Sequence, residues 1–201
     1  NRIVILINEA RDQGVDVEVP NINISFSEFR ALSDKKISFG LSAIKNVGSK
    51  AAETIVEHRE NNNSYNTIFD LCQIDSGAVN RKALESLIQA GACDDLSGNR
   101  AQQFEIIDSA IKFGQKLIQD TKSLQASLFT NSNSTSSIIS EPKLSNIEEW
   151  SKRDSLRNEK EMLGFYLSGN PLDDYSEDLN ELNNINLLNL PNKLPEKIKV
   201  G

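Results

Sequence analysis

Histidine and cysteine are scarce in this sequence, and their scarcity excludes several kinds of site. The chain of 201 residues has one His and two Cys. Cys72 and Cys93 lie far apart with no Cys or His beside them, so a zinc site lacks ligands and we expect no metal site. Such sparing use of cysteine fits a reducing cytoplasm. His58 falls on the polar side of an expected helix, where we expect a solvated residue rather than a ligand or a base.

Long apolar runs are also absent. No stretch approaches the roughly 18 residues of a membrane span, so we expect no membrane partner. The opening NRIVILINEARDQG lacks the basic lead and the small-residue cleavage site of a signal peptide, and it predicts an ordinary helix. An initiating Met is missing, and KIKVG stops within an expected strand, so we expect a piece of a longer chain. The 38% share of hydrophobic residues is enough for an ordinary buried core.

Basic residues are outnumbered overall, but the two signs of charge are separated along the chain. The net charge is −7. Residues 30–59 hold six basic and three acidic residues, a balance of +3, whereas residues 141–182 hold five basic and eleven acidic residues, a balance of −6. A basic front half and an acidic back half indicate contact with an anionic partner at one end only.

Apolar residues at spacings of three and four predict a mainly helical fold. We expect helices over residues 2–13, 41–60 in two short pieces, 67–73, 79–92, 99–119 and 148–168. Thr67 is expected to cap one helix with Asp70 three residues later, and Gly14 and Gly91 are expected to end two others. Residues 15–25 and the alternating KISFGL predict extended segments.

The composition changes after Phe129. Ser, Asn and Thr fill more than half of residues 130–146. Burial within such a segment is too small to offset the entropy of ordering it, so we predict a flexible linker over 130–146. The Leu128–Phe129 pair before it would gain roughly 1.5–3 kcal/mol per side chain from burial, so we expect either the chain or a partner to cover it.

The segment AIKNVGSKAA carries the clearest chemical signal in the first half of the chain. A tight turn with Gly48 joins two expected helices, so the turn amides and the start of the second helix would point outward together. Lys45 and Lys50 flank this turn, and Arg59 lies two to three helical turns further on. Such a site would bind a phosphate oxygen and ignore base sequence. The alternative is a plain helical corner with two solvated lysines.

The same segment resembles the turn of helix-hairpin-helix DNA-binding modules. Ile44, Val47, Gly48 and Lys50 match the motif, while Asn46 stands where many members have Gly. Asn tolerates left-handed backbone angles better than most residues. The candidate DNA-binding residues of this hairpin are Lys45, Asn46, Val47, Gly48, Ser49, Lys50 and Arg59. The later segment DSGAVNRKALESLIQAGACDDL resembles a degenerate second copy, with Arg81 and Lys82 as candidate phosphate contacts.

Four longer phrases resemble one family. They are VPNINISFSEF, ISFGLSAIKNVGSKAAETIVEHR, FDLCQ with VNRKALESLIQAGACDDL, and EKEMLGFYLSGNPLDDY. The order and spacing of these phrases are similar to those in the alpha subunits of DNA polymerase III, the family of bacterial replicative DNA polymerases. Val19 and Asn21 replace a Pro and an Asp that are common in the family, and Asn170 replaces a frequent His.

The resemblance implies a division of the chain. Residues 1–24 would end the fingers domain, and 25–129 would form the helix-hairpin-helix DNA-binding and clamp-binding region. After the flexible linker of 130–146, a helical and turn-rich connector would cover 147–196. Residues 197–201 would begin an OB-fold β-barrel. The expected fold class is therefore mainly α, with the start of a small barrel at the end.

The resemblance also implies a role for QASLF. It is similar to the family's sliding-clamp-binding motif, with Gln125, Leu128 and Phe129 as the clamp-binding residues on an extended segment. Leu128 and Phe129 would enter an apolar pocket on the clamp, and Gln125 would hydrogen-bond at its rim. Taken alone, such a short motif is more typical of the end of an amphipathic helix.

The whole enzyme that this chain resembles is a DNA-directed DNA polymerase, a nucleotidyltransferase that uses Mg²⁺ in a two-metal displacement. Its partners would be double-stranded DNA, the sliding clamp or beta subunit, and other subunits of the holoenzyme, in the bacterial cytoplasm. The two-metal reaction needs clustered carboxylates, and the adjacent pairs Asp94–Asp95 and Asp173–Asp174 are better interpreted as caps or solvated residues. We therefore expect no catalytic residue and no cofactor in this fragment.

Two other hypotheses use the same residues. A helix-hairpin-helix DNA-repair protein, such as a base-excision glycosylase, would need a catalytic Asp or Lys downstream of the hairpin in a ligand pocket. A non-catalytic helical adaptor would leave Lys45 and Lys50 merely solvated, and their replacement by Glu would not alter DNA affinity.

Overall fold

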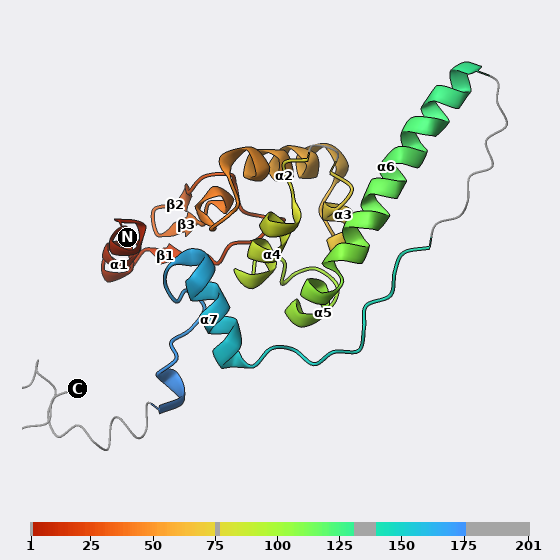
Figure 1. The fold of residues 1–201 in the computed structure, drawn as a ribbon. Coiled ribbons are helices and arrows are strands. Elements are labelled where there is room, and N and C mark those ends of the chain that lie inside the picture. The colour runs from red at the N-terminus through yellow and green to blue at the C-terminus, as the bar shows by residue number, and fades with distance from the viewer. Residues whose placement is uncertain (1, 75–76, 131–139, 176–201) are drawn as a thin grey trace, which may run out of the picture. The chain divides into compact units, whose positions relative to one another are not determined.

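The computed structural model describes residues 2–74, 77–130 and 140–175, with only the backbone described for 124–130 and 174 (Figure 1). The chain divides into two units, Asn1–Leu167 and Ser168–Gly201. In the second unit the described residues form one 3-10 turn, η2 (Asp173–Tyr175). The segment in which we expect an OB-fold to begin, residues 197–201, lies outside the described residues.

Helices make up most of the first unit, as the apolar spacing predicts. They are α1 (Arg2–Asp12), the 3-10 turn η1 (Leu41–Ala43), α2 (Ser49–Asn62), α3 (Ile68–Leu71), α4 (Arg81–Gln89), α5 (Arg100–Glu105), α6 (Ile107–Thr130) and α7 (Lys152–Leu163). The mainly α fold class is confirmed. Several boundaries differ from expectation. The first piece of the hairpin is only the 3-10 turn η1, and a break at Ile106 divides the helix expected over 99–119, whose second part runs on to Thr130. The helix expected over 148–168 is shorter, covering Lys152–Leu163.

The predicted helix ends are confirmed where a cap specifies them. Thr67 and Asp70 form a reciprocal capping box at α3. Gly14 and Gly91 follow α1 and α4 with φ of 75° and 80°, a backbone conformation that glycine adopts without strain. Local side-chain chemistry therefore sets these helix boundaries.

A small sheet of three strands lies beside α1. Its strands β1 (Asp16–Val17), β3 (Lys36–Ser38) and β2 (Arg30–Ser33) lie in that order, with β1 parallel and β2 antiparallel to β3. We did not predict β2. All four of its residues are exposed, so this edge strand carries no alternation of apolar and polar residues for a sequence pattern to detect.

The hydrophobic core is built mainly from the hairpin helices and the start of α6, and it extends to α1, β1 and the end of α7. Its largest fully buried side chains include Phe39, Phe69, Leu41, Ile55 and Leu87. Gly114 allows α6 to pack closely on the end of α3, because a Cβ at this position would lie 2.0 Å from the Cys72 carbonyl oxygen. Burial raises the pKa of the Cys72 thiol to about 12, which fits a packing role.

Residues 140–151, which we call the strap, run back along α5 toward α7 (Figure 1). Gln102 Nε2 donates to the Ser145 carbonyl at 2.7 Å, and Asn99 Nδ2 donates to the Ile147 carbonyl at 2.9 Å. Part of the predicted linker, residues 131–139, lies outside the described residues. The remainder, residues 140–146, is held by the Gln102–Ser145 hydrogen bond and by packing of Leu144 against the core, contacts that its Ser-rich composition did not predict.

Candidate nucleic-acid interface

The first hairpin presents the start of α2 on a rigid turn. Ile44 and Val47 are each 2% exposed and anchor the turn in the core. Gly48, with extended backbone, precedes α2, and no described side chain accepts a hydrogen bond from the first amides of this helix. The first amides of an α-helix have no acceptor within it and carry its positive dipole end. Gly48, Ser49 and Lys50 are exposed, so this end of α2 is open to an anion.

Asn46 shapes the turn. Its φ of 65° is left-handed, as predicted for an Asn at a position where many related hairpins have Gly. The side-chain amide of Asn46 donates from Nδ2 to Ser86 Oγ at 3.0 Å, and Ser86 is only 2% exposed on α4. The turn of the first hairpin is thereby fixed to the helix of the second.

Lys45 links the turn to α7. Its backbone amide donates to the Met162 carbonyl at 2.9 Å, and its Nζ pairs with Glu161 Oε1 at 3.2 Å. Both charged side chains are more than half exposed, so the pair contributes little to stability and a phosphate can replace Glu161. Lys50 is also exposed. The structure therefore brings Lys45, Lys50 and the α2 amides into one short segment.

Arg59 does not join this group. Its Nη1 donates to the carbonyls of Ile22 at 2.6 Å and Ser25 at 3.0 Å. These bonds hold the 21–25 loop against the later part of α2. Arg59 is thus a structural residue of the hairpin, and we omit it from the proposed contact.

The second hairpin differs from the first. Asn80 caps α4, and its side-chain oxygen accepts a hydrogen bond from the Ala83 amide. This amide at the start of α4 is therefore already paired and is not open to an anion. Arg81 pairs with Glu85 at 2.7 Å and with Asp108, and hydrogen bonds to these carboxylates raise its pKa. Lys82 is exposed. The geometry therefore favours the first hairpin over the second as a candidate phosphate site.

The clamp-motif segment is helical here. Residues 125–129 lie in the last turns of α6, so the expectation of an extended segment is wrong for this structure. Apolar residues at helical spacing continue from α6 into the motif, which accounts for the helix. The side chains of Gln125, Leu128 and Phe129 lie outside the described part of the chain.

His58 is not the solvated residue that we expected. Its ring stacks on Tyr65 with centroids 5.6 Å apart, and its Nδ1 atom is buried without a hydrogen-bond partner among the described residues. Burial lowers the pKa of His58. The amphipathic pattern of α2 missed this contact because Tyr65 lies beyond the end of the helix.

Three of the four carboxylates in the adjacent pairs have structural partners, and the side chain of Asp174 lies outside the described residues. Asp94 accepts two hydrogen bonds from Arg100, Asp95 accepts one from Asn21, and Asp173 accepts one from the Asn170 amide.

In the described ranges no group of three or more His, Cys, Asp or Glu could hold a metal ion. Nor does any helix in those ranges have the length and apolar character needed to cross a membrane.

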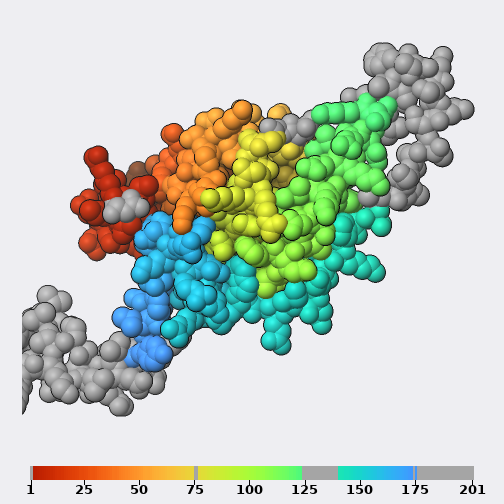
Figure 2. Space-filling model, viewed as in Figure 1, coloured from red at the N-terminus to blue at the C-terminus, as the bar shows by residue number. Residues whose placement is uncertain are grey.

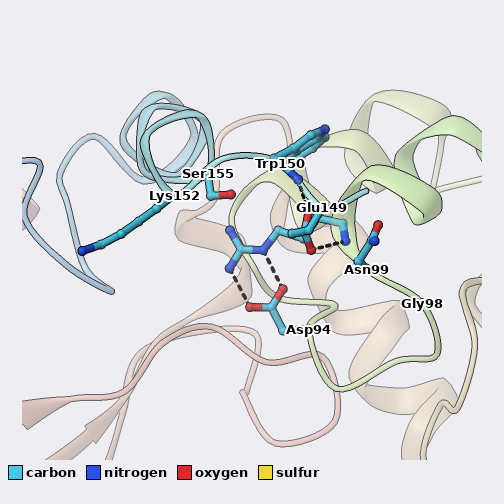
Figure 3. A pocket seen from close by; sticks show the side chains of 8 residues that line it. Asp94, Gly98, Asn99, Glu149, Trp150, Lys152 and Ser155 are labelled. Atoms are coloured by element: carbon cyan, nitrogen blue, oxygen red, sulfur yellow. Dashed lines mark hydrogen bonds and ion pairs between the residues drawn. The ribbon is translucent and has the colours of Figure 1, made fainter. Parts of the chain in front are cut away.

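Asp94 also borders the cavity in Figure 3, which has a volume of about 410 Å³. Both Arg100–Asp94 contacts are 2.6 Å long, and Glu149 accepts from the Arg100 amide at 2.9 Å. Arg100 thus joins α5 to Asp94, which follows α4, and to Glu149 of the strap. We interpret the cavity as a packing gap among these segments and the start of α7.

Three residues beside the first hairpin escaped the sequence analysis. Ser86, Glu161 and Met162 contact the turn from α4 and α7. The sequence gives one indication of the Ser86 contact, because Ser86 is a polar residue on the apolar side of an amphipathic helix. The Met162 contact is made by a carbonyl, which no side-chain pattern reveals.

Comparison with known proteins gives the family. A family model described as a helix-hairpin-helix motif matches residues 14–103, which include both hairpins. The proteins named DNA polymerase III subunit alpha from Buchnera aphidicola and Xylella fastidiosa are 36% and 37% identical over 89% and 90% of this chain. That of Borreliella burgdorferi is 36% identical over 94% of it. The chain belongs to the DNA polymerase III subunit alpha family.

The match concerns one segment of these long proteins. The chain spans 15–16% of the length of the three DNA polymerase III alpha subunits. The resemblance seen in the four sequence phrases is confirmed.

Proposed function

We propose that this chain is the segment of a bacterial replicative polymerase that holds duplex DNA by its backbone. The observation that carries the proposal is the uncapped start of α2 beside the exposed Lys45 and Lys50. Helix amides and ammonium groups bind phosphate oxygens, which every DNA sequence presents alike. Val47, the apolar residue of the turn, is buried and does not reach the bases.

Affinity in isolation is expected to be modest. The net charge of −7 repels DNA, and one hairpin contacts few phosphates. Within a full-length polymerase, other parts of the protein would perform the Mg²⁺-dependent polymerisation and other holoenzyme subunits would join it in the cytoplasm. This segment would hold the duplex.

We infer a second attachment at QASLF. Gln125, Leu128 and Phe129 would bind the sliding clamp, with the two apolar side chains in a pocket of the partner. The motif occupies the last turns of α6, and terminal turns of helices open most readily. Two attachments to the same DNA, one through the hairpin and one through the ring, raise effective concentration and hence processivity.

Binding to two unrelated duplexes tests the DNA-holding role. Fluorescence anisotropy should give equal affinities for both sequences, and each should weaken steeply with salt. Sequence preference, or binding that salt leaves unchanged, would contradict the proposal.

Clamp binding is tested separately with the purified bacterial sliding clamp. Surface plasmon resonance should detect the wild-type chain at micromolar strength or better and lose the signal for Leu128→Ala/Phe129→Ala. A Ser127→Ala variant, which changes a residue within the motif that we do not assign to the clamp, should bind as wild type. Equal binding by the double variant and wild type would show that QASLF is only the end of a helix.

A further inference from the structure

The outward side of α7 carries a line of basic residues. Arg153, Arg157 and Lys160 are all exposed, and their spacing of four and three residues places them on one face of the helix. The residues that face the core are Leu156, Glu159, Met162 and Leu163. We call Arg153, Arg157 and Lys160 the α7 basic face.

This face adjoins the first hairpin. The Lys45 amide donates to the Met162 carbonyl, and Lys45 pairs with Glu161, the chain neighbour of Lys160. Figure 2 shows the light-blue residues of α7 bordering the orange residues of the hairpin region on one surface. The α7 basic face therefore lies on the helix that borders the turn, next to the flank on which Glu161 contacts Lys45.

The helix is fixed at both ends, so the face has a defined direction. The Ser151 side chain caps the start of α7 by accepting from the Asp154 amide, and Gly164, with φ of 89°, ends it. Burial of its inner residues prevents rotation about the helix axis. The three cations therefore point away from the core together.

The charges of the face are available to an anion. Arg157 pairs with Asp154 at 2.9 Å, but the Arg157 side chain is 74% exposed, and such surface pairs are weak. Lys160 Nζ lies 4.7 Å from the centre of the Tyr166 ring, which orients the ammonium group without neutralising it. The nearby acids Asp154 and Glu161 lie on the adjoining flank of the helix.

We propose that the α7 basic face is a second contact for the duplex backbone, next to the first hairpin. The proposal rests on the DNA-holding function proposed above. From Arg153 to Lys160 the helix rises about 10 Å, a length along which one DNA strand presents about three phosphates. Side chains that project from a helix surface as separate charges would contact phosphates and leave base edges unread.

The test compares two variants that each lose two positive charges. Arg153→Gln/Lys160→Gln removes both ends of the face, and Lys112→Gln/Lys116→Gln removes two exposed lysines of α6 as a matched control. Gln keeps helix propensity close to that of Arg and Lys. Binding of the 201-residue chain to one duplex is measured at several salt concentrations, and thermal unfolding checks that both variants fold.

For Arg153→Gln/Lys160→Gln, the slope of log K against log salt should fall by about 1.8, and affinity should drop about tenfold or more near 0.1 M salt. The α6 control should keep the wild-type slope. An unchanged slope in the α7 variant, together with a reduced slope in Lys45→Gln/Lys50→Gln, would overturn this inference and leave the hairpin function standing. Unchanged slopes in both would overturn the DNA-holding function itself.

Discussion

The side-chain amide of Asn46 donates a hydrogen bond to the buried hydroxyl of Ser86, 3.0 Å away. This bond joins the turn of the first hairpin, for which we propose phosphate binding, to α4 of the second. The degenerate second hairpin thus supports the first one, even though its own helix start is closed by Asn80. The first hairpin therefore presents its helix start to solvent, and the second hairpin fixes the position of the first.

Replacing Asn46 separates its two contributions. Asn46→Ala should lose the hydrogen bond, worth about 0.5–1.5 kcal/mol, and add left-handed strain of about 1–2 kcal/mol. Asn46→Gly should lose the bond and raise the entropy of the unfolded chain, but it should add no strain, because glycine accepts a φ of 65°. Urea unfolding should rank wild type above Asn46→Gly and Asn46→Gly above Asn46→Ala. If the Ala variant unfolds at the wild-type midpoint, the bond and the turn geometry are unimportant.

Gly114 and Gly48 make a contrasting pair. A methyl group at Gly114 would lie 2.0 Å from the Cys72 carbonyl oxygen, whereas one at Gly48 would meet open space. Gly114→Ala should therefore destabilise the chain by about 1–3 kcal/mol, despite the better helix propensity of Ala. Gly48→Ala should fold normally and keep DNA binding, since the α2 amides remain. A stable Gly114→Ala variant would show that α3 and α6 do not pack this closely.

His58 should make stability depend on pH. Burial lowers its pKa below the ordinary value of 6.5, so the unfolded chain binds this proton more readily than the folded one. Stability should accordingly be full above about pH 7 and fall as the pH drops through 6.5 toward the lower folded pKa. Chemical unfolding of wild type and His58→Phe from pH 7.5 to 5.5 checks this. The Phe variant keeps a ring against Tyr65 and should lose less stability; parallel curves would contradict the assignment.

Local chemistry made much of the fold predictable. The Thr67–Asp70 capping box and the glycines after α1 and α4 act within one helical turn, and sequence patterns detect such short-range rules. The exposed strand β2 lacked a hydrophobic pattern and is held by backbone pairing with β3. The strap has only scattered apolar residues, of which Leu144 and Trp150 pack against the core, and the amides of Asn99 and Gln102 hold its backbone. These amide contacts join segments more than forty residues apart, and composition does not encode them.

The candidate site was predictable to a similar degree. The turn sequence placed Lys45, Gly48 and Lys50 together because they are neighbours in the chain. The partners of Arg59 are carbonyls of the 21–25 loop, more than thirty residues away. The sequence therefore could not show that Arg59 holds this loop. The contacts of the turn with Ser86 and Met162 depend on tertiary packing for the same reason.

The salt dependence of duplex binding by Lys45→Gln/Lys50→Gln, beside wild type and Lys112→Gln/Lys116→Gln, tests the central claim most directly. If the first hairpin holds phosphates, the slope of log K against log salt should fall by up to about 1.8 in the hairpin variant. The α6 control should retain the wild-type slope. Identical slopes and affinities for all three proteins would contradict the account.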